Sequence, residues 1–304
     1  MLVRIGRVNI DSFLLSDYRN VGFAYRFVRP PVEFYGSLPV SLDGIDVSRD
    51  LRFDNSRWRL KAFAGRSVSG GLAVDGRVGA NPVFGVTVSR ESDGLTVRLG
   101  FARTGFSSNA PELRPLIDGL DAMTAVPVPE VAAQARELAA SLDNKGDHTI
   151  YQSLGLNYEV RDWQWTLELT KVSGHPTSRF VAGYAGVGRR FGSVTLSGGV
   201  SRIRTPGLPV ATPDWASALT PVLDPAAAQQ AQILASSAAY ARNASGANQQ
   251  PLSLGLRWDP DPQMSLKVQW DHVRIDANGG RLWSNATLDS GHANVMSVAL
   301  DFIF

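Results

Sequence analysis

The sequence predicts an all-β fold, an antiparallel transmembrane β-barrel. Three observations predict it: about a dozen segments in which every second residue is large and apolar, segment lengths of mostly 8–12 residues, and connections that alternate between short and long. A period of two residues marks one face of a β-strand. A tilted transmembrane strand needs about 9–11 residues, whereas strands of globular proteins usually have about 5–6.

The composition allows this architecture and excludes several others. Hydrophobic residues make up 44% of the 304 residues, and the mean hydropathy is −0.07. No run approaches the ~18 apolar residues of a transmembrane helix, but a barrel strand exposes only alternate residues to lipid. The absence of cysteine excludes disulfides and cysteine-ligated metals. A net charge of +2 without a Lys/Arg-rich run gives no reason to expect nucleic acid as a partner.

The strand candidates alternate an apolar face with a polar one. In 94–103, Leu95, Val97, Leu99 and Phe101 oppose Thr96, Arg98 and Gly100. A soluble sandwich alternates in the same way, so strand length and connections are needed to choose the membrane barrel. In chain order the candidates are 2–10, 57–65, 70–79, 83–90, 94–103, 149–160, 162–172, 180–190, 192–203, 251–258, 263–273 and 294–304.

The last strand ends on an apolar and aromatic face. Met296, Val298, Leu300, Phe302 and Phe304 are its alternate residues, and the chain stops at the last of them. A closing barrel strand commonly places such aromatics at the membrane interface. We therefore expect Phe302 and Phe304 to act in membrane assembly, with the barrel assembly machinery and membrane lipid as partners. Aromatics of a soluble core are the alternative reading.

The connections predict two edges with different roles. Counting back from the C-terminus, 274–293 is long, 259–262 is short, 204–250 is very long and 190–192 is short. Tight turns on one side and long loops on the other are typical of membrane barrels. The stretch 80–82 breaks the rule, because it is short where a long loop is expected. Loops 104–148 and 204–250 contain helical patterns, at Pro129–Leu142 and after the Asp224-Pro225 N-cap.

Catalysis has little support in the sequence. The four histidines are scattered without metal-ligand spacing, and Gly186-Val-Gly188 lacks the crossover helix of a dinucleotide site. We interpret these glycines as small residues in a crowded barrel wall. No cofactor and no metal are expected.

Segment 11–56 is the most informative connection. It is long, charged and stiffened by Pro30-Pro31, so it is a candidate to fold inward and narrow the barrel. A solvated external loop is the alternative. The candidate constriction residues are Arg19, Arg26, Arg29, Glu33, Tyr35, Asp43, Asp46 and Arg49. Within this set, Arg26 and Arg29 are expected to lie across from Glu33, Asp43 and Asp46 and to favour anions.

The stretch Val21-Gly-Phe-Ala-Tyr-Arg-Phe-Val-Arg-Pro-Pro-Val-Glu-Phe-Tyr-Gly36, with Asp43-Gly44 after it and the C-terminal Phe304, resembles proteobacterial outer-membrane porin-like proteins. The resemblance covers most of the chain and is most specific over 2–53. It departs at the front, where a signal peptide and several strands are lacking. Porins of this kind have about sixteen strands. The resemblance therefore implies about 12 strands here of 16, an N-terminally truncated chain and a homotrimer in the bacterial outer membrane.

The expected function is passive diffusion of small hydrophilic solutes or ions through a wet interior. We expect the following side chains on the polar face to line it: Arg57, Arg59, Lys61, Arg77, Arg98, Glu168, Arg257 and Lys267. Two alternatives stay open. A lipase-like barrel enzyme needs a Ser–His cluster on its outer wall, and a secretion barrel needs an N-terminal helix through the pore, which residues 1–10 do not resemble.

Overall fold

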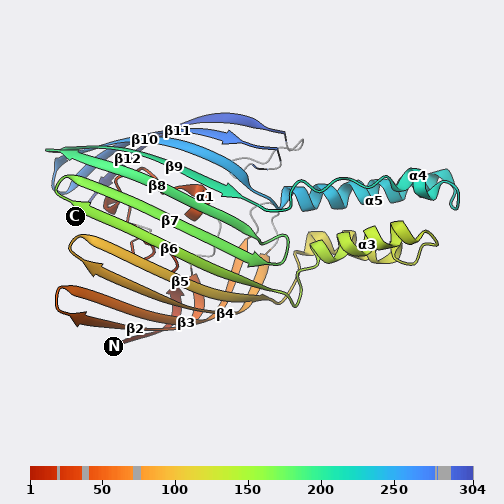
Figure 1. Cartoon of the computed structure of the whole chain (residues 1–304), viewed down its shortest axis with the longest axis horizontal. Coiled ribbons are helices and arrows are strands. Elements are labelled where there is room, and N and C mark those ends of the chain that lie inside the picture. Colours follow the sequence, from red (N-terminus) through yellow and green to blue (C-terminus); the bar gives the residue numbers. More distant parts are fainter. Residues whose placement is uncertain (19–20, 36–40, 71–76, 278, 280–288, 304) are drawn as a thin grey trace.

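The computed structural model describes residues 1–304 except 19–20, 36–40, 71–76, 278, 280–288 and 304, and leaves aside the side chains of 68–70 and 77–78. Twelve antiparallel strands form one sheet in chain order, β1 to β12 (Figure 1). Their bounds are β1 Leu2–Asn9, β2 Ser41–Phe53, β3 Ser56–Gly70, β4 Arg77–Ser92, β5 Leu95–Phe106, β6 His148–Val160, β7 Trp163–Gly174, β8 Phe180–Phe191, β9 Val194–Arg204, β10 Asn248–Asp261, β11 Met264–Ile275 and β12 Gly291–Phe302.

Strands β1 and β3 to β12 each contain an expected segment, but one strand was not expected. Residues 41–53 form β2 and not part of a loop, so the connection after β1 ends before Ser41. The expected strand 70–79 lies mostly outside the described residues, because 71–76 are not described; Gly70 ends β3 and Arg77 begins β4. The sheet has twelve strands, and eleven of them contain an expected segment.

The short stretch 80–82 is also explained. It lies inside β4, where the register with β3 and β5 shifts between Ala80 and Val83. It is therefore an irregularity within a strand and not a loop. With this correction short and long connections alternate along the whole chain.

The two edges of the sheet are clearly different. At one edge, which we call the short-turn edge, strands are joined by 54–55, 93–94, 161–162, 192–193 and 262–263. Asp93 and Gly94 both have positive φ, at 50° and 76°, which is the geometry of the tight hairpin turns that match strand twist. The other, the long-connection edge, carries all the longer connections. Both termini lie at the short-turn edge (Figure 1).

The outer face of the sheet is apolar and the inner face is polar. Leu99 and Leu254 are 54% and 52% exposed, whereas Arg98 and Lys267 are 5% and 1% exposed. Leu167 and Val268 lie on the outer face as well, beside the buried Glu168 and Lys267. This is the reverse of a soluble sandwich and the arrangement of a barrel in lipid.

The inner face is covered by the chain between β1 and β2. Residues 10–35, which we call the inner segment, contain the 3-10 helix η1 (Gly22–Ala24) and the one-turn helix α1 (Val32–Tyr35). The segment contacts inward side chains from β3, the third strand in the order, to β12, the last. The sheet is therefore curved around it. Among the described residues, β1 pairs with β2 alone and β12 with β11 alone.

The two longest connections form helices that project beyond the long-connection edge (Figure 1). They are η2 (Pro111–Leu113), α2 (Arg114–Met123), α3 (Pro129–Leu142), α4 (Trp215–Leu219) and α5 (Pro225–Ala244). The expected stripe Val131, Ala135, Leu138 and Leu142 is buried, and it packs in a core shared with Trp215 of the other connection. The Asp224 carboxylate caps α5 by accepting the N–H groups of Ala226 and Ala227. In the described part of the chain, no helix has the length and apolarity to span a membrane.

The two faces of β5 generate a stability prediction. Leu99→Arg places a charge on the apolar outer face and should destabilise the folded protein by about 2–4 kcal/mol in a bilayer. Thr96→Arg on the inner face of the same strand is the matched control and should change stability little, because Thr96 lines a recess of about 540 Å³. Denaturant unfolding of the full-length protein in lipid vesicles measures both. Equal destabilisation by the two substitutions would contradict the assignment of faces.

Candidate functional site: the inner segment and the polar wall

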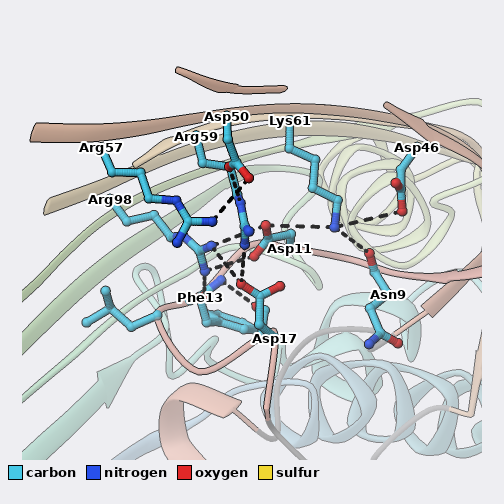
Figure 2. A network of polar contacts seen from close by, with 12 residues as sticks. Asn9, Asp11, Phe13, Asp17, Asp46, Asp50, Arg57, Arg59, Lys61 and Arg98 are labelled. Atoms are coloured by element: carbon cyan, nitrogen blue, oxygen red, sulfur yellow. Dashed lines mark hydrogen bonds and ion pairs between the residues drawn. The ribbon is translucent and has the colours of Figure 1, made fainter. Parts of the chain in front are cut away.

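The start of the inner segment is held by cations of β3 and β5. The Asp11 carboxylate lies 2.8 Å from the Arg98 guanidinium and 3.7 Å from Lys61 Nζ. Arg98 also donates to the carbonyl of Phe13. Burial raises the pKa of the Asp11 carboxyl, and the charges of Arg98 and Lys61 oppose this effect. Figure 2 shows these groups converging on the segment from the wall.

The same network extends along β2 and β3 (Figure 2). Asp50 binds Arg57 at 3.1 Å and Arg59 at 2.9 Å, and Arg59 also reaches Asp17 of the inner segment at 3.2 Å. Further along β2, Asp46 forms an ion pair with Arg4 of β1 at 2.8 Å. Charges on this wall are therefore paired locally and do not form one large field of a single sign.

A single buried carboxylate holds both ends of the inner segment. Glu168 of β7 is 2% exposed. Its Oε1 accepts the Leu14 N–H at 2.7 Å, and its Oε2 accepts the hydroxyl groups of Tyr35 and of Tyr184, the latter at 2.7 Å. Leu14 lies early in the segment and Tyr35 lies at its far end, so this carboxylate closes the segment into a fixed loop.

The middle of the segment is bound through its backbone. Arg257 of β10 donates to the carbonyl oxygens of Phe23 and Tyr25 at 2.6 and 2.7 Å. Lys267 of β11 donates to the Gly22 carbonyl and lies 2.9 Å from Asp301 of β12. Because main-chain carbonyls accept these bonds, this attachment depends on the path of the backbone and not on particular side chains of the segment.

The Arg26 side chain packs against the inner wall at two glycines, Gly186 and Gly188. Its guanidinium donates to Gln164 Oε1 at 2.8 Å and to Thr166 Oγ1 at 3.1 Å. A Cβ atom on Gly186 would be 3.0 Å from Arg26 Nη2, and one on Gly188 would be 3.1 Å from its Cδ. The two glycines thus leave the space that the arginine fills. Burial lowers the pKa of Arg26, and no carboxylate pairs with it among the described residues.

Arg29 and Glu33 end the segment on the opposite wall. Arg29 forms an ion pair with Asp271 at 2.6 Å and donates to Ser297 at 2.9 Å. Glu33, 1% exposed, accepts hydrogen bonds from Ser201 at 2.9 Å and from Gln249. Burial raises the pKa of Glu33, and hydrogen bonds to its carboxylate partly oppose the shift.

Three expected constriction residues belong to β2 instead of the inner segment. Asp46 is on the inner face, but Asp43 and Arg49 are exposed on the outer face, and Asp43 pairs with Arg7 of β1 at 2.8 Å. The reason is the period of two in a strand, which puts odd and even residues on opposite faces. Asp43 and Arg49 therefore lie outside the interior, and Asp46 faces Arg4 and Lys61 instead of Arg26 and Arg29.

The other expected residues are placed as follows. Arg26, Arg29, Glu33 and Tyr35 lie together in the inner segment. Of the expected lining residues, Arg57 and Arg59 keep partly exposed side chains, and Arg257 is half-buried. Lys61, Arg98, Glu168 and Lys267 face inward but are buried beneath the segment, so they hold it and do not meet free solvent. Phe302 is 61% exposed on the outer face. Arg19, the Arg77 side chain and Phe304 fall outside the described residues.

Two features escaped the sequence argument. Asp11 and Asp17 were not singled out, because nothing in the sequence links them to Arg98 and Arg59. Strand β2 did have a signal: Ile45, Val47, Leu51 and Phe53 alternate with polar residues. The many charged residues of 41–53 made the alternation of apolar and polar residues hard to recognise.

No protein-family model matches the chain, and no curated protein of similar sequence was found. Solved structures do match in fold. An anion-selective porin from Comamonas acidovorans aligns with 99% of this chain and 74% of its own, at TM-score 0.52 and 11% identity. OmpF of Salmonella typhi aligns with 98% and 74% at TM-score 0.53 and 10% identity. OmpT of Vibrio cholerae aligns with 99% and 76% at TM-score 0.50 and 8% identity.

The chain therefore has an all-antiparallel β-barrel fold, and the fold is similar to that of these outer-membrane porins. At such low identity the likeness concerns the fold alone. What the interior does has to be argued from its own residues.

Glu168→Gln tests the attachment of the inner segment. Three groups now donate hydrogen bonds to the Glu168 carboxylate. In the glutamine variant the amide NH₂ would face at least one of these donors, and that hydrogen bond would be lost. Hydrogen bonds to a charged group are worth about 1.5–3 kcal/mol each. Hydrogen exchange at the Leu14 amide should accelerate roughly tenfold or more, while the central strands keep their protection. Glu159→Gln, on the inner face of β6 but exposed, is the control. Unchanged exchange at Leu14 would show that Glu168 does not hold the segment.

Proposed function

We propose that the chain forms the wall and the constriction of an outer-membrane porin, a passive diffusion channel for small hydrophilic solutes or ions. One observation carries the proposal: a sheet that exposes apolar side chains outward encloses a polar interior crossed by a fixed segment. An apolar outer surface is stable in lipid, and a polar interior is stable when it is hydrated. The fold likeness to porins supports the same location and role.

In this proposal, the inner segment of residues 10–35 sets the width of the channel. It is attached to walls on both sides through Asp11, Glu168, Arg257 and Lys267, so it cannot swing away as a solvated external loop would. Size selection requires such a fixed obstacle. The recess of about 540 Å³ at the short-turn edge, lined by Arg57, Glu91 and Glu159 among others, is the hydrated mouth on one side of it.

The enzyme alternative has no comparable support. In the described residues no serine hydroxyl is hydrogen-bonded to a histidine: His175 contacts Thr177 and Ala140, and His272 contacts Asn294. The secretion-barrel alternative needs a helix along the interior. Here the interior is crossed by a largely non-helical segment whose backbone is bound to the wall.

Shortening the inner segment tests the size limit. Replacing residues 12–34 of the full-length protein by a short Gly/Ser linker should raise single-channel conductance in planar bilayers about twofold or more, because the obstacle is removed. Replacing part of the helical connection, residues 112–142, by the same linker is the control and should leave the conductance near that of the wild type. If the first variant conducts like the wild type, the segment is not the constriction.

Arg26 is the cation of the segment without a carboxylate partner in the described residues, so it should carry the ion preference. Arg26→Gln should move the reversal potential in a salt gradient toward cations, since it removes a positive charge that forms no ion pair with a carboxylate in the described residues. Arg189→Gln on the outer face is the matched control and should have no effect. Identical reversal potentials for all three proteins would remove Arg26 from the permeation path.

A further inference from the structure

Two histidines lie together on the outer face of the last two strands. In β11 and β12 the even-numbered residues face outward, and His272 and His292 are both among them. Their ring centroids are 6.0 Å apart, and the ring planes are inclined by 33°. The two residues are far apart in the sequence, so the pairing of β11 with β12 brings them together (Figure 1).

The register of this strand pair explains the contact. His272 is directly opposite Asn294, and His292 is directly opposite Arg274. The two histidines are therefore diagonal neighbours across an antiparallel pair. Diagonal neighbours are about 7–8 Å apart, which is within reach of aromatic side chains. The shorter distance between the ring centroids shows that the two imidazoles lean toward each other.

The surroundings of His272 prepare its ring to bind a metal ion. Its Nδ1 lies 3.0 Å from Asn294 Oδ1. An amide oxygen only accepts hydrogen bonds, so the neutral ring carries its proton on Nδ1 and leaves the lone pair on Nε2. Metal-binding histidines have this arrangement, in which the second ring nitrogen donates to an oxygen acceptor. The Trp270 ring lies 6.0 Å away and gives the imidazole a second neighbour.

The other two histidines of the chain are placed differently. His175 is 3% exposed, and its ring nitrogens contact the Thr177 hydroxyl and the Ala140 carbonyl. His148 is exposed at the long-connection edge, and its ring has no hydrogen bond or ring contact among the described residues. Within that part of the chain, only His272 and His292 combine a ring–ring contact with ring nitrogens that no protein group occupies.

We propose that His272 and His292 together bind one divalent transition-metal ion of the kind that prefers imidazole ligands, such as Zn²⁺ or Cu²⁺. Imidazole nitrogens bind zinc at about 2.0–2.1 Å, which places the centroids of two rings on one ion about 5 Å apart. The exposed His292 side chain needs only a small movement to reach this spacing. No third His, Asp or Glu joins the pair in the described chain, so water completes the coordination.

The bound ion would link the last two strands of the sheet across their outer face. Among the described residues β12 pairs with β11 alone, so an ion held by one histidine from each strand adds a second connection between them. The site lies outside the polar interior and uses none of the residues that hold the inner segment. The proposal therefore does not depend on the porin function proposed above.

Single substitutions in the full-length protein, purified without a histidine tag, test the site. Cu²⁺ is titrated into each protein in detergent micelles near neutral pH and followed by calorimetry. His272→Gln and His292→Gln should each weaken binding at least about tenfold, because each removes one ligand. His148→Gln removes an exposed histidine that has no imidazole neighbour, and it should bind within about twofold of the wild type. A wild type without measurable Cu²⁺ binding, or equal affinities in all four proteins, would overturn the proposal.

Copper electron paramagnetic resonance counts the ligands. The wild-type spectrum should show coupling to two imidazole nitrogens, and the spectrum of either single variant should show coupling to one. A wild-type spectrum with a single nitrogen would mean that the two histidines do not share an ion.

Asn294 gives a test in which affinity rises. Asn294→Asp supplies a stronger acceptor for the His272 Nδ1–H and a negative charge, so Cu²⁺ should bind more tightly than in the wild type, a gain that misfolding does not produce. Asn294→Leu removes the acceptor and should weaken binding about tenfold. Unchanged affinity in both variants would contradict the assignment of Nε2 as the ligand atom.

Competition identifies the class of metal. Zn²⁺ should displace Cu²⁺, although at higher concentration, because copper binds nitrogen ligands more strongly. Ca²⁺ and Mg²⁺ should not displace it, because they prefer oxygen ligands. If Ca²⁺ competes as well as Zn²⁺, the ion is held by oxygen atoms and the histidine site is wrong.

Discussion

The structure depends on hydrogen bonds and ion pairs between the inner segment and the charged inner wall. Arg98, Arg257 and Lys267 face inward from three strands, and each donates to a main-chain carbonyl of the segment. Glu168 accepts from the first and last parts of the same segment. A charge buried without a partner costs several kcal/mol. The buried charges of the wall are stable only when the segment supplies their partners, and the segment keeps its path only when the wall binds it. The curved sheet and the inner segment therefore form one structural unit.

This mutual dependence explains features of the sequence that have no local cause. Gly186 and Gly188 are small because Arg26 occupies their space, and a Cβ atom on Gly155 would meet Leu14 at 2.7 Å. Inward glycines therefore mark where the segment passes close to the sheet. The aromatic side chains of Phe13, Phe34 and Tyr35 pack against Tyr151 and Tyr184 of the wall, which adds an apolar contact to the polar ones.

The helical connections follow a separate logic. They share a core of Leu, Val, Ala, Ile117 and Trp215, which contains no strand residue in the described part of the chain, and they project from the edge instead of covering the interior. The two connections are far apart in the chain, but each buries its apolar helix face against the other. A helix with one apolar face needs such a partner surface. His175 connects this part to the barrel by its contact with the Ala140 carbonyl at 3.1 Å.

The sequence by itself determined the fold class, eleven of the twelve strands, the alternation of short and long connections and the two longest helices. Each follows from local periodicity, which is fixed by residues two, three or four positions apart. It failed at 41–53, where charged residues interrupt an alternating strand, and it placed a connection at 80–82, where the register shifts inside β4. Only the tertiary structure decided which charges meet. Asp11 and Arg98 are 87 residues apart, and Leu14 and Glu168 are 154 apart, so their pairing depends on where the curved sheet brings each strand and not on any neighbouring residue.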